Sequence, residues 1–358
     1  MKKLLMGPSG GTAAPMSAFM KFFVEATSGS AQIDLVPQMW RRMVGITNRE
    51  LIRATPELVK GWDKIGGSPI IPSCKNTNVF ELELKSGGSL NLSRFVKEFC
   101  QGYEGIVAIG GGGTTKQSAR LHKDEGLNLI VPVATMDNDV SHFDTVLGYD
   151  TARTSAGYAI NACVNDALTM QRPTAIILMG YECGRLGVGS VDFAREKLGC
   201  KVDMLHIPET EVAIEDVARK INKEYHGGAF TIAISEGVCK AETVTNEGQH
   251  KKFSTADYMK KLSALTGIEF KVLTPDYVQR SGIPTQKDVD LAKKFAIRAA
   301  GLIEDGTWNY VIGMKNGSVE ILPLEKTVEL INEQKNSIAE WYSTKEMSLD
   351  RVKDILIR

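Results

Sequence analysis

The sequence lacks an excess of charge of either sign, a long apolar run and any close pairing of its cysteines. Its 43 lysines and arginines balance 43 aspartates and glutamates, so the formal net charge at pH 7 is zero. This balance argues against a nucleic-acid surface and against attachment to an anionic membrane. A membrane-spanning helix needs about 20 consecutive apolar residues, and no stretch reaches that length. We therefore expect a protein that binds neither nucleic acid nor membrane.

Cysteine and histidine are both scarce, with six and five residues respectively. No two cysteines form a Cys-x-x-Cys pair, so we expect free thiols in a reducing compartment rather than a structural zinc site. The apolar start at Leu4–Met6 is interrupted by Gly7-Pro8, which makes it too short for a signal peptide. These features predict a cytoplasmic protein, and its 358 residues are enough for two lobes.

Two stretches share one design, a short apolar strand followed at once by small or polar residues. In Gly105–Thr115 the strand leads into four glycines, and in Leu127–Asp139 it leads to the acidic pair Asp137 and Asp139. Ligands of open α/β sheets bind at the carboxyl ends of the strands. If the two strands are neighbours, the carboxylates lie opposite bare backbone N–H groups. That layout suits the transfer of a phosphoryl group to a hydroxyl, with Asp137 taking the proton.

A third stretch, Leu4–Ala18, repeats the strand and glycine turn before a helix that continues through Phe19–Glu25. Ser9 or Thr12 is expected to cap that helix, and its N-terminus is an anion site in principle. The Walker A pattern and G-x-G-x-x-G are both absent from it. Taken alone, a glycine turn or an Asp-Asn-Asp after a strand is more often only a connection or a cap.

Strand and helix patterns alternate along the chain and predict an α/β fold with two Rossmann-like lobes, each a mainly parallel sheet flanked by helices. In the second half, a long helix over Thr151–Gln171 precedes strands at Ala175–Met179, Val202–Ile207 and Phe230–Ser235. The predicted boundaries are 1–148 plus about 279–325 for the larger lobe, 149–278 for the smaller lobe, and 326–358 for a C-terminal segment of solvated helices.

Several blocks follow one another in a characteristic order between about residue 4 and residue 320. They are Ser9–Ala18, Gly110–Thr114, Thr135–Asp139, Thr145–Ala152, Met179-Gly180, Glu236-Gly237 and Gln279–Gly282. Together they resemble the 6-phosphofructokinase family of phosphotransferases. The first two resemble its phosphate loops, the third its Thr-Ile-Asp-Asn-Asp catalytic block, and the last three its sugar-binding segments.

The resemblance implies that the larger lobe binds the phosphoryl donor, Mg²⁺ and ATP. It gives Asp137 as the general base, Thr135 as a hydrogen-bond partner of the transferring phosphoryl group, and Asp139 as a contact for Mg²⁺ and the sugar. The residues implied in donor binding are Gly10, Gly11, Lys75, Gly111, Gly112, Gly113 and Thr114.

For the acceptor, the resemblance implies a sugar phosphate in the smaller lobe, by default fructose 6-phosphate. Arg172 and Lys271 stand where family members bind the acceptor's phosphate from a neighbouring subunit, which implies a homodimer or homotetramer. Arg280 would clamp a phosphate near the transfer site, because its guanidinium matches phosphate bidentately. The other residues implied in acceptor binding are Met179, Gly180, Tyr181, Glu236 and Tyr277.

The sequence departs from the family pattern at five of these positions. Gly112 replaces an aspartate that serves Mg²⁺, Tyr181 an arginine that stabilises the transferring phosphate, Tyr277 a histidine, and Lys271 an arginine. Lys75, after Cys74, stands about where an arginine is expected near the donor phosphates. We predict that Arg185 takes over the missing arginine's task, because Tyr181 and Arg185 are four residues apart and would share one face of a helix. The alternative is a solvated helix arginine paired with a nearby carboxylate.

The donor and the activity itself leave alternatives. Pyrophosphate-using relatives tend to carry aspartate at the Gly113 position and lysine at the Ala134 position, so the small residues here leave room for ATP. Pyrophosphate is the alternative donor, and another sugar or a polyol is the alternative acceptor. A catalytically silent sugar-phosphate sensor or partner subunit would fit the losses at Gly112 and Tyr181.

Overall fold

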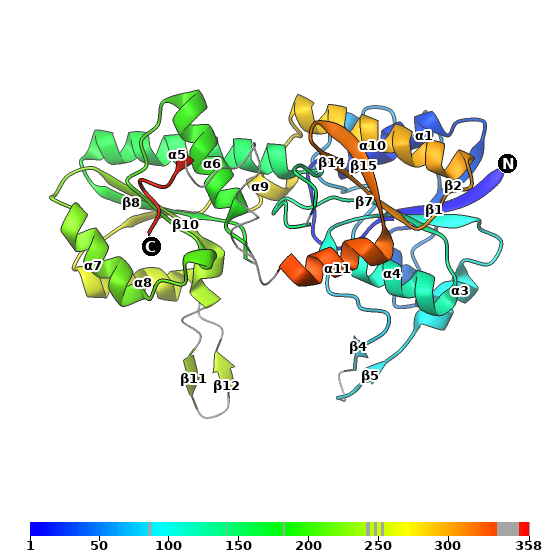
Figure 1. The fold of residues 1–358 in the computed structure, drawn as a ribbon, viewed down its shortest axis with the longest axis horizontal. Coiled ribbons are helices and arrows are strands. Elements are labelled where there is room, and N and C mark those ends of the chain that lie inside the picture. Colours follow the sequence, from blue (N-terminus) through cyan, green and yellow to red (C-terminus); the bar gives the residue numbers. More distant parts are fainter. Residues whose placement is uncertain are drawn as a thin grey trace. The chain divides into compact units, whose positions relative to one another are not determined.

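The computed structural model describes residues 1–84, 87–140, 142–181, 183–240, 244–246, 249–251, 254–334 and 351–357. The chain divides into two compact units, one of Met1–Thr151 with Arg280–Ser337 and the other of Ala152–Gln279 with Ile338–Arg358. Each unit is built on a sheet flanked by helices, which confirms the predicted α/β class (Figure 1). Within the described residues, no helix is both long and apolar enough to cross a membrane.

A seven-stranded sheet forms the centre of the first unit, in the order β15-β14-β7-β6-β1-β2-β3. Neighbours from β14 to β2 run parallel, whereas β15 and β3 pair antiparallel at the two edges. The strands are β1 (Lys2–Pro8), β2 (Ala31–Leu35), β3 (Ile52–Arg53), β6 (Gly105–Ile109), β7 (Leu129–Pro132), β14 (Tyr310–Lys315) and β15 (Ser318–Pro323).

Helices cover both faces of this sheet. α1 (Met16–Ala26) and α10 (Gln286–Glu304) pack over one face, and α2 (Met39–Met43), α3 (Ser93–Phe99), α4 (Gly112–Glu125) and α11 (Leu324–Gln334) over the other (Figure 1). Along β1, Leu4 and Met6 belong to the first core and Leu5 to the second. A strand buried on both faces reads as a continuous apolar run, which is the pattern that the sequence shows here.

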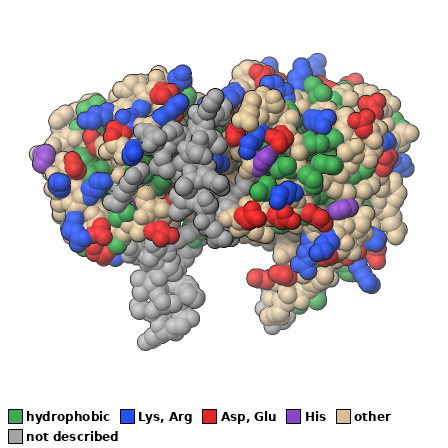
Figure 2. Space-filling model, viewed as in Figure 1, with side chains coloured by type: hydrophobic (Ala, Val, Ile, Leu, Met, Phe, Trp, Pro, Cys, Tyr) green, Lys and Arg blue, Asp and Glu red, His purple; other side chains and the backbone are tan. Residues whose placement is uncertain are grey.

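The second unit has a four-stranded parallel sheet in the order β13-β8-β10-β9. Its strands are β8 (Pro173–Leu178), β9 (Met204–His206), β10 (Phe230–Ser235) and β13 (Lys271–Leu273). α5 (Tyr149–Met170) and α6 (Arg185–Leu198) contribute to the core on one face, and α7 (Ile214–Glu224) and α8 (Thr255–Thr266) to the core on the other. In the view of Figure 2, positive and negative side chains are interspersed on each unit.

Shorter elements complete the described chain. They include two short antiparallel hairpins outside the main sheets, β4 (Leu82–Glu83) with β5 (Ser89–Leu90) and β11 (Val244–Asn246) with β12 (Gln249–Lys251). The remaining short helices are η1 (Trp62–Lys64), η2 (Pro208–Thr210), η3 (Glu236–Lys240) and α9 (Val278–Ser281).

The C-terminal residues differ from the solvated helices expected over 326–358. α11 is helical, and 335–350 lie outside the described residues, but residues 351–357 pack into the second unit instead. Leu205 N donates to Ile355 O at 2.8 Å, and Ile357 N donates to Leu205 O at 2.9 Å, so this segment lies against β9. Val352 and Ile357 are fully buried there, and burying these apolar side chains favours the packed conformation over a solvated helix.

Candidate active site

The loops that follow three neighbouring strands meet at one edge of the seven-stranded sheet. β1, β6 and β7 are adjacent and parallel, so their carboxyl ends lie together. Ser9 N donates to Ile109 O at 2.8 Å, and Ala134 N donates to Gly110 O at 3.0 Å. The glycine loops and the acidic loop are therefore side by side in the first unit, as the paired strand patterns predict.

Glycine is required in these loops because the backbones approach closely. A Cβ on Gly110 would lie 2.2 Å from Thr114 Oγ1, and one on Gly111 would lie 3.2 Å from Thr135 Cβ. Gly10 has φ +82, a left-handed conformation, and its N donates to Cys74 O at 2.9 Å. Lys75 follows that cysteine and is exposed. The close contacts bring Gly10, Gly111 and Thr114, which are predicted to bind the donor, to the start of the Thr135–Asp139 loop.

α4 begins at this edge, with Gly111 as its N-cap and no side-chain cap. The first N–H groups of a helix have no partner inside the helix, and its dipole favours an anion there. In α4 these groups belong to Gly112, Gly113 and Thr114. The edge of the sheet thus has the character of a phosphate site.

The prediction that Ser9 or Thr12 caps α1 is wrong. α1 begins at Met16 with Pro15 as its N-cap and no side-chain cap, so Ser9 and Thr12 both lie before the helix. Proline at the cap position separates the glycine turn from the helix. Ser9 instead takes part in a buried contact with Trp40 and Thr114.

The acidic loop Thr135–Asp139 is organised by its own threonine. Thr135 Oγ1 accepts from Asp137 N at 3.2 Å and donates to Asp139 Oδ1 at 3.0 Å. Thr135, Asp137 and Asp139 are half-buried, while the residues between them are buried. Asn138 has φ +51, and its Nδ2 donates to Asp144 O at 2.7 Å. The loop therefore keeps Thr135, Asp137 and Asp139 partly exposed while Met136 and Asn138 are buried.

Arg280 lies against the first glycine loop. A Cβ on Gly11 would lie 3.0 Å from Arg280 Nη1, so the guanidinium is next to the backbone that is expected to hold phosphate. The side chain is half-buried at the end of α9. The first unit thus gathers glycine N–H groups, a guanidinium, a hydroxyl and two carboxylates.

An aspartate at position 112 fits this geometry. A Cβ there would have Ile331 Cδ1 at 3.8 Å and Cγ2 at 4.0 Å, which are ordinary contacts, and Gly112 is not left-handed. We expect Gly112→Asp to fold and to lower the half-saturating Mg²⁺ concentration for ATP-driven turnover by at least about threefold, because Mg²⁺ prefers carboxylate oxygen. Gly112→Asn is the control of equal size. An unchanged Mg²⁺ dependence in a folded Gly112→Asp protein would argue against metal binding at this loop.

Asp288 is a buried carboxylate that sequence patterns did not single out for the site. It accepts from Thr151 N at 2.9 Å, from Thr151 Oγ1 at 2.5 Å and from Gly148 N at 3.2 Å. Asp288 belongs to α10, and these hydrogen bonds cap the start of α5, the helix that follows the acidic loop. The signal for it is Thr285-x-x-Asp288, in which Thr285 Oγ1 accepts from Asp288 N at 3.3 Å, half of a capping box.

Burial raises the pKa of Asp288 to about 6, although hydrogen bonds from Thr151 oppose the rise. The folded state then holds this proton more tightly than the unfolded state, whose carboxyl has its ordinary pKa of 3.8. The contribution to stability is therefore present below about pH 4 and is lost as pH rises to about 6. We expect this carboxylate to reduce the free energy of unfolding by about 3 kcal/mol across that window. Denaturant titrations of wild type and Asp288→Asn test this, because the difference between their pH profiles isolates the group. Parallel profiles would contradict it.

In the second unit, the segments expected to bind sugar also meet at strand ends. Met179–Tyr181 follow β8 and Glu236-Gly237 follow the neighbouring β10. A Cβ on Gly237 would lie 2.5 Å from Tyr181 O and 3.0 Å from Gly180 O. Met179 N donates to Gln279 Oε1 at 3.3 Å, and Gln279 is fully buried. Gly180 has φ +117, which places it outside the range of most side chains.

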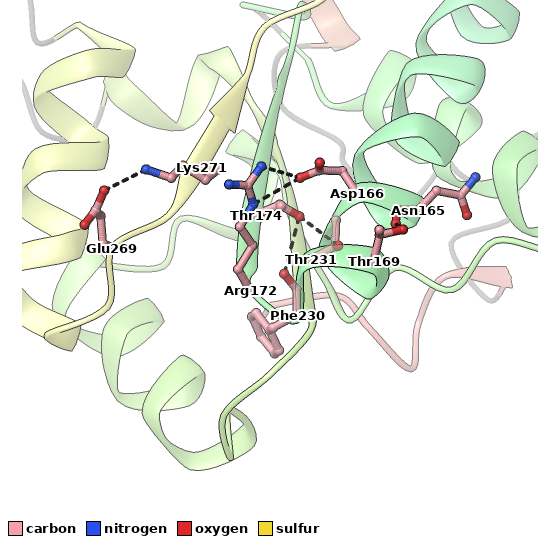
Figure 3. Close-up of polar contacts among 9 residues, drawn as sticks. All are labelled: Asn165, Asp166, Thr169, Arg172, Thr174, Phe230, Thr231, Glu269 and Lys271. Atoms are coloured by element: carbon pink, nitrogen blue, oxygen red, sulfur yellow. Dashed lines mark hydrogen bonds and ion pairs between the residues drawn. The ribbon is translucent and has the colours of Figure 1, made fainter.

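Arg172 and Lys271 lie at the opposite ends of these strands. Arg172 immediately precedes β8, and Lys271 pairs with Thr174 at the amino end of β8. Met179 follows Thr174 by five steps along the chain, roughly 16 Å in extended conformation. Arg172 donates to Asp166 Oδ2 from Nη2 at 2.8 Å and from Nε at 3.2 Å, and Lys271 Nζ donates to Glu269 Oε1 at 2.9 Å (Figure 3). In the second unit of a single chain, Arg172 and Lys271 therefore lie at the amino ends of the strands, whereas Met179 lies at the carboxyl end of β8. Tyr277 is 76% exposed.

The shared helical face predicted for Tyr181 and Arg185 is wrong. α6 begins at Arg185 with Gly184 as its N-cap, so Tyr181 lies before the helix. The helix starts there because Gly184 N donates to Glu209 Oε1 at 2.7 Å, a contact from a distant part of the chain. Arg185 is also only 4% exposed, so it is not a solvated helix arginine either.

We expect Arg185→Ala to lower the free energy of unfolding by about 2–5 kcal/mol, because it removes a long buried side chain. Arg219→Ala on α7, where the arginine side chain is 76% exposed, is the control and should change it by less than about 0.5 kcal/mol. Denaturant titration compares the two. Unchanged stability together with a kcat lowered by about two decades would instead support the catalytic role predicted from the sequence.

Comparisons with known proteins agree with this architecture. A family model described as Phosphofructokinase matches residues 3–303. The ATP-dependent 6-phosphofructokinase of Lactococcus lactis subsp. lactis is 27% identical over 333 residues, which cover 92% of this chain and 89% of that protein.

Solved structures share the fold. Pichia pastoris phosphofructokinase in the T-state matches 99% of this chain with a TM-score of 0.76 and 19% identity, and this chain covers 41% of that one. The pyrophosphate-dependent phosphofructokinase from Nitrosospira multiformis matches 99% of this chain and 90% of its own with a TM-score of 0.77 and 16% identity. The resemblance inferred from the sequence blocks is confirmed by the family model, and the chain belongs to the phosphofructokinase family.

Proposed function

We propose that this protein transfers the γ-phosphoryl group of ATP to a hydroxyl of a sugar phosphate, with fructose 6-phosphate as the default acceptor. The observation that carries the proposal is the meeting of the two glycine loops, Arg280 and the Thr135–Asp139 loop at one sheet edge. Curated relatives named ATP-dependent 6-phosphofructokinase support ATP as the donor. Solved structures named pyrophosphate-dependent share the fold at 16% identity, which does not bear on the donor.

In this proposal Asp137 takes the proton of the acceptor hydroxyl. The hydroxyl oxygen then forms a bond to the γ-phosphorus, and the bond from that phosphorus to the β–γ bridging oxygen breaks. ADP leaves, and the acceptor carries a new phosphate. The N–H groups at the start of α4 and the Arg280 guanidinium hold charge on the phosphate oxygens, which is the main task in phosphoryl transfer. Thr135 already orders Asp137 through its backbone N.

The residues present fit a magnesium ion held mainly by the donor. Asp139 is the carboxylate that would contact it, since Mg²⁺ keeps several waters and needs few protein carboxylates. The described residues contain no group of three or more histidines, cysteines, aspartates or glutamates that could hold a metal by themselves. Bound Mg²⁺ would neutralise charge on the transferring phosphate.

Arg172 and Lys271 are proposed to serve the acceptor site of a second copy of this chain. Their place at the amino ends of β8 and β13, away from Met179, supports donation to a neighbour rather than use within the same unit. The active protein would then be a homodimer or a homotetramer.

Initial rates with ATP or pyrophosphate against a panel of phosphosugars, sugars and polyols test the proposal. We expect turnover with Mg²⁺ and ATP, highest with a sugar phosphate. The departures at Gly112 and Tyr181 favour one further candidate, a silent sugar-phosphate sensor. Tight binding of fructose 6-phosphate without turnover of any donor would establish that candidate and overturn ours.

A further inference from the structure

Ser9 is the hub of a buried hydrogen-bond chain that no catalytic step uses. Ser9 Oγ accepts from Trp40 Nε1 at 2.6 Å and from Thr114 Oγ1 at 3.0 Å. All three side chains are at most 4% exposed. Ser9 lies in the loop after β1, Thr114 in the first turn of α4 and Trp40 on α2. These hydrogen bonds therefore connect the two glycine loops to each other and to α2.

The donors and acceptors of the hydrogen bonds among Trp40, Ser9 and Thr114 can be counted. An indole N–H only donates, and a serine hydroxyl has two lone pairs and one hydrogen. Trp40 and Thr114 occupy both lone pairs of Ser9 Oγ, so its own hydrogen is left for a third group. Within the described residues, no acceptor for that hydrogen is found. A hydroxyl that accepts two hydrogen bonds is polarised into a stronger donor.

The surroundings of Ser9 favour an anionic oxygen as that third group. The next residues, Gly10 and Gly11, form the turn against which Arg280 Nη1 lies, and α4 begins beside them with its positive end. A Cβ on Gly110 would lie 2.4 Å from Ser9 O, so the backbones leave no room for another side chain between them.

We propose that Ser9 donates a hydrogen bond to a phosphate oxygen of the phosphoryl donor, and that Trp40 is the positioning residue that orients it. Trp40 itself touches no ligand in this arrangement. Its indole N–H fixes which way the Ser9 hydroxyl is turned, so the donor loop is set before the donor arrives. The inference rests on the proposed function, because it takes the ligand of the loop to be a phosphate.

The first test replaces tryptophan by phenylalanine at two positions. Trp40→Phe keeps an aromatic side chain but loses the N–H, and we expect it to raise the KM for ATP at least about tenfold, the loss of one hydrogen bond. The KM for the acceptor should change less than about threefold. Trp62→Phe is the matched control, since Trp62 is 3% exposed in the same unit and its indole N–H has no partner among the described residues. Equal effects of the two variants on the KM for ATP would overturn the inference.

A double-mutant cycle tests the path through Ser9. Ser9→Ala should raise the KM for ATP at least as much as Trp40→Phe does. Adding Trp40→Phe to Ser9→Ala should then change that KM by less than about twofold, because the group that Trp40 orients is gone. Additive effects would show that Trp40 acts by another route and would contradict the proposal.

A third measurement separates this inference from the proposed function. Calorimetry of wild type with ATP and with inorganic pyrophosphate shows whether the loop binds phosphate at all, and binding of neither would overturn the proposed function and the phosphate contact of Ser9. Amide hydrogen exchange needs no ligand. Relative to Trp62→Phe, Trp40→Phe should speed exchange at Ser9–Gly11 at least about tenfold, and equal protection in the two variants would overturn the positioning role of Trp40.

Discussion

Asp137→Asn is expected to lower kcat by about two to four decades while leaving the affinity for the acceptor within about threefold of wild type. Asparagine has nearly the same shape, and the backbone contact of residue 137 to Thr135 Oγ1 does not depend on the side chain. What the substitution removes is the group that, in the proposed mechanism, takes the proton of the acceptor hydroxyl. Steady-state rates with saturating ATP give kcat, and calorimetry with fructose 6-phosphate gives the affinity.

Asp144→Asn is the control for this prediction. Asp144 follows the same loop, but its Oδ2 accepts from Asn316 N at 2.7 Å, a structural contact in the first unit. The control should keep kcat within about threefold of wild type. Turnover of Asp137→Asn near the wild-type level, with a saturating and defined acceptor, would remove Asp137 as the base.

Arg280→Ala is expected to lower kcat by about three decades, because arginine contacts to a transferring phosphoryl group are worth three to five decades in related chemistry. The guanidinium lies next to Gly11, one of the residues proposed to bind the donor, so in the proposed mechanism its loss removes positive charge beside the transferring phosphate. Arg280→Lys keeps the charge but loses the fork, and it should recover only part of the loss.

Arg298→Ala, which removes an exposed arginine of α10 in the same unit, should leave kcat unchanged and controls for the general loss of positive charge. The measurement is kcat with saturating donor and acceptor, accompanied by a melting temperature for each variant. If Arg280→Ala loses less than about threefold in kcat, the guanidinium does not stabilise the transfer, and its place beside Gly11 is structural.

The sheet edge that carries the site could be predicted because its pattern is local. Phe230–Ser235 forms β10 as expected, and the apolar runs before Gly110 and Val133 form β6 and β7. Once those strands are parallel neighbours, the residues that follow them must meet at one edge. The acidic pair Asp137 and Asp139 that follows β7 is likewise readable from the sequence.

The predictions that the structure contradicts failed because contacts between distant parts of the sequence decide those features. α6 starts at Arg185 because its N-cap residue Gly184 donates a backbone hydrogen bond to the side chain of Glu209, 25 residues away. Residues 351–357 pack along β9 through hydrogen bonds to Leu205, about 150 residues away. Ser9 lies six residues before Pro15, the N-cap of α1, and its oxygen accepts from Trp40 and Thr114 instead. No periodicity or propensity within a short window contains these contacts, so tertiary structure decides them.

Transfer of the labelled γ-phosphoryl group of ATP, followed in purified protein with Mg²⁺ and fructose 6-phosphate, tests the central claim most directly. We predict that the label appears in fructose 1,6-bisphosphate, that the reaction depends on Mg²⁺, and that Asp137→Asn reduces its rate by about two to four decades. Label that stays in ATP, or that is released only as inorganic phosphate at a rate unaffected by Asp137→Asn, would contradict the account.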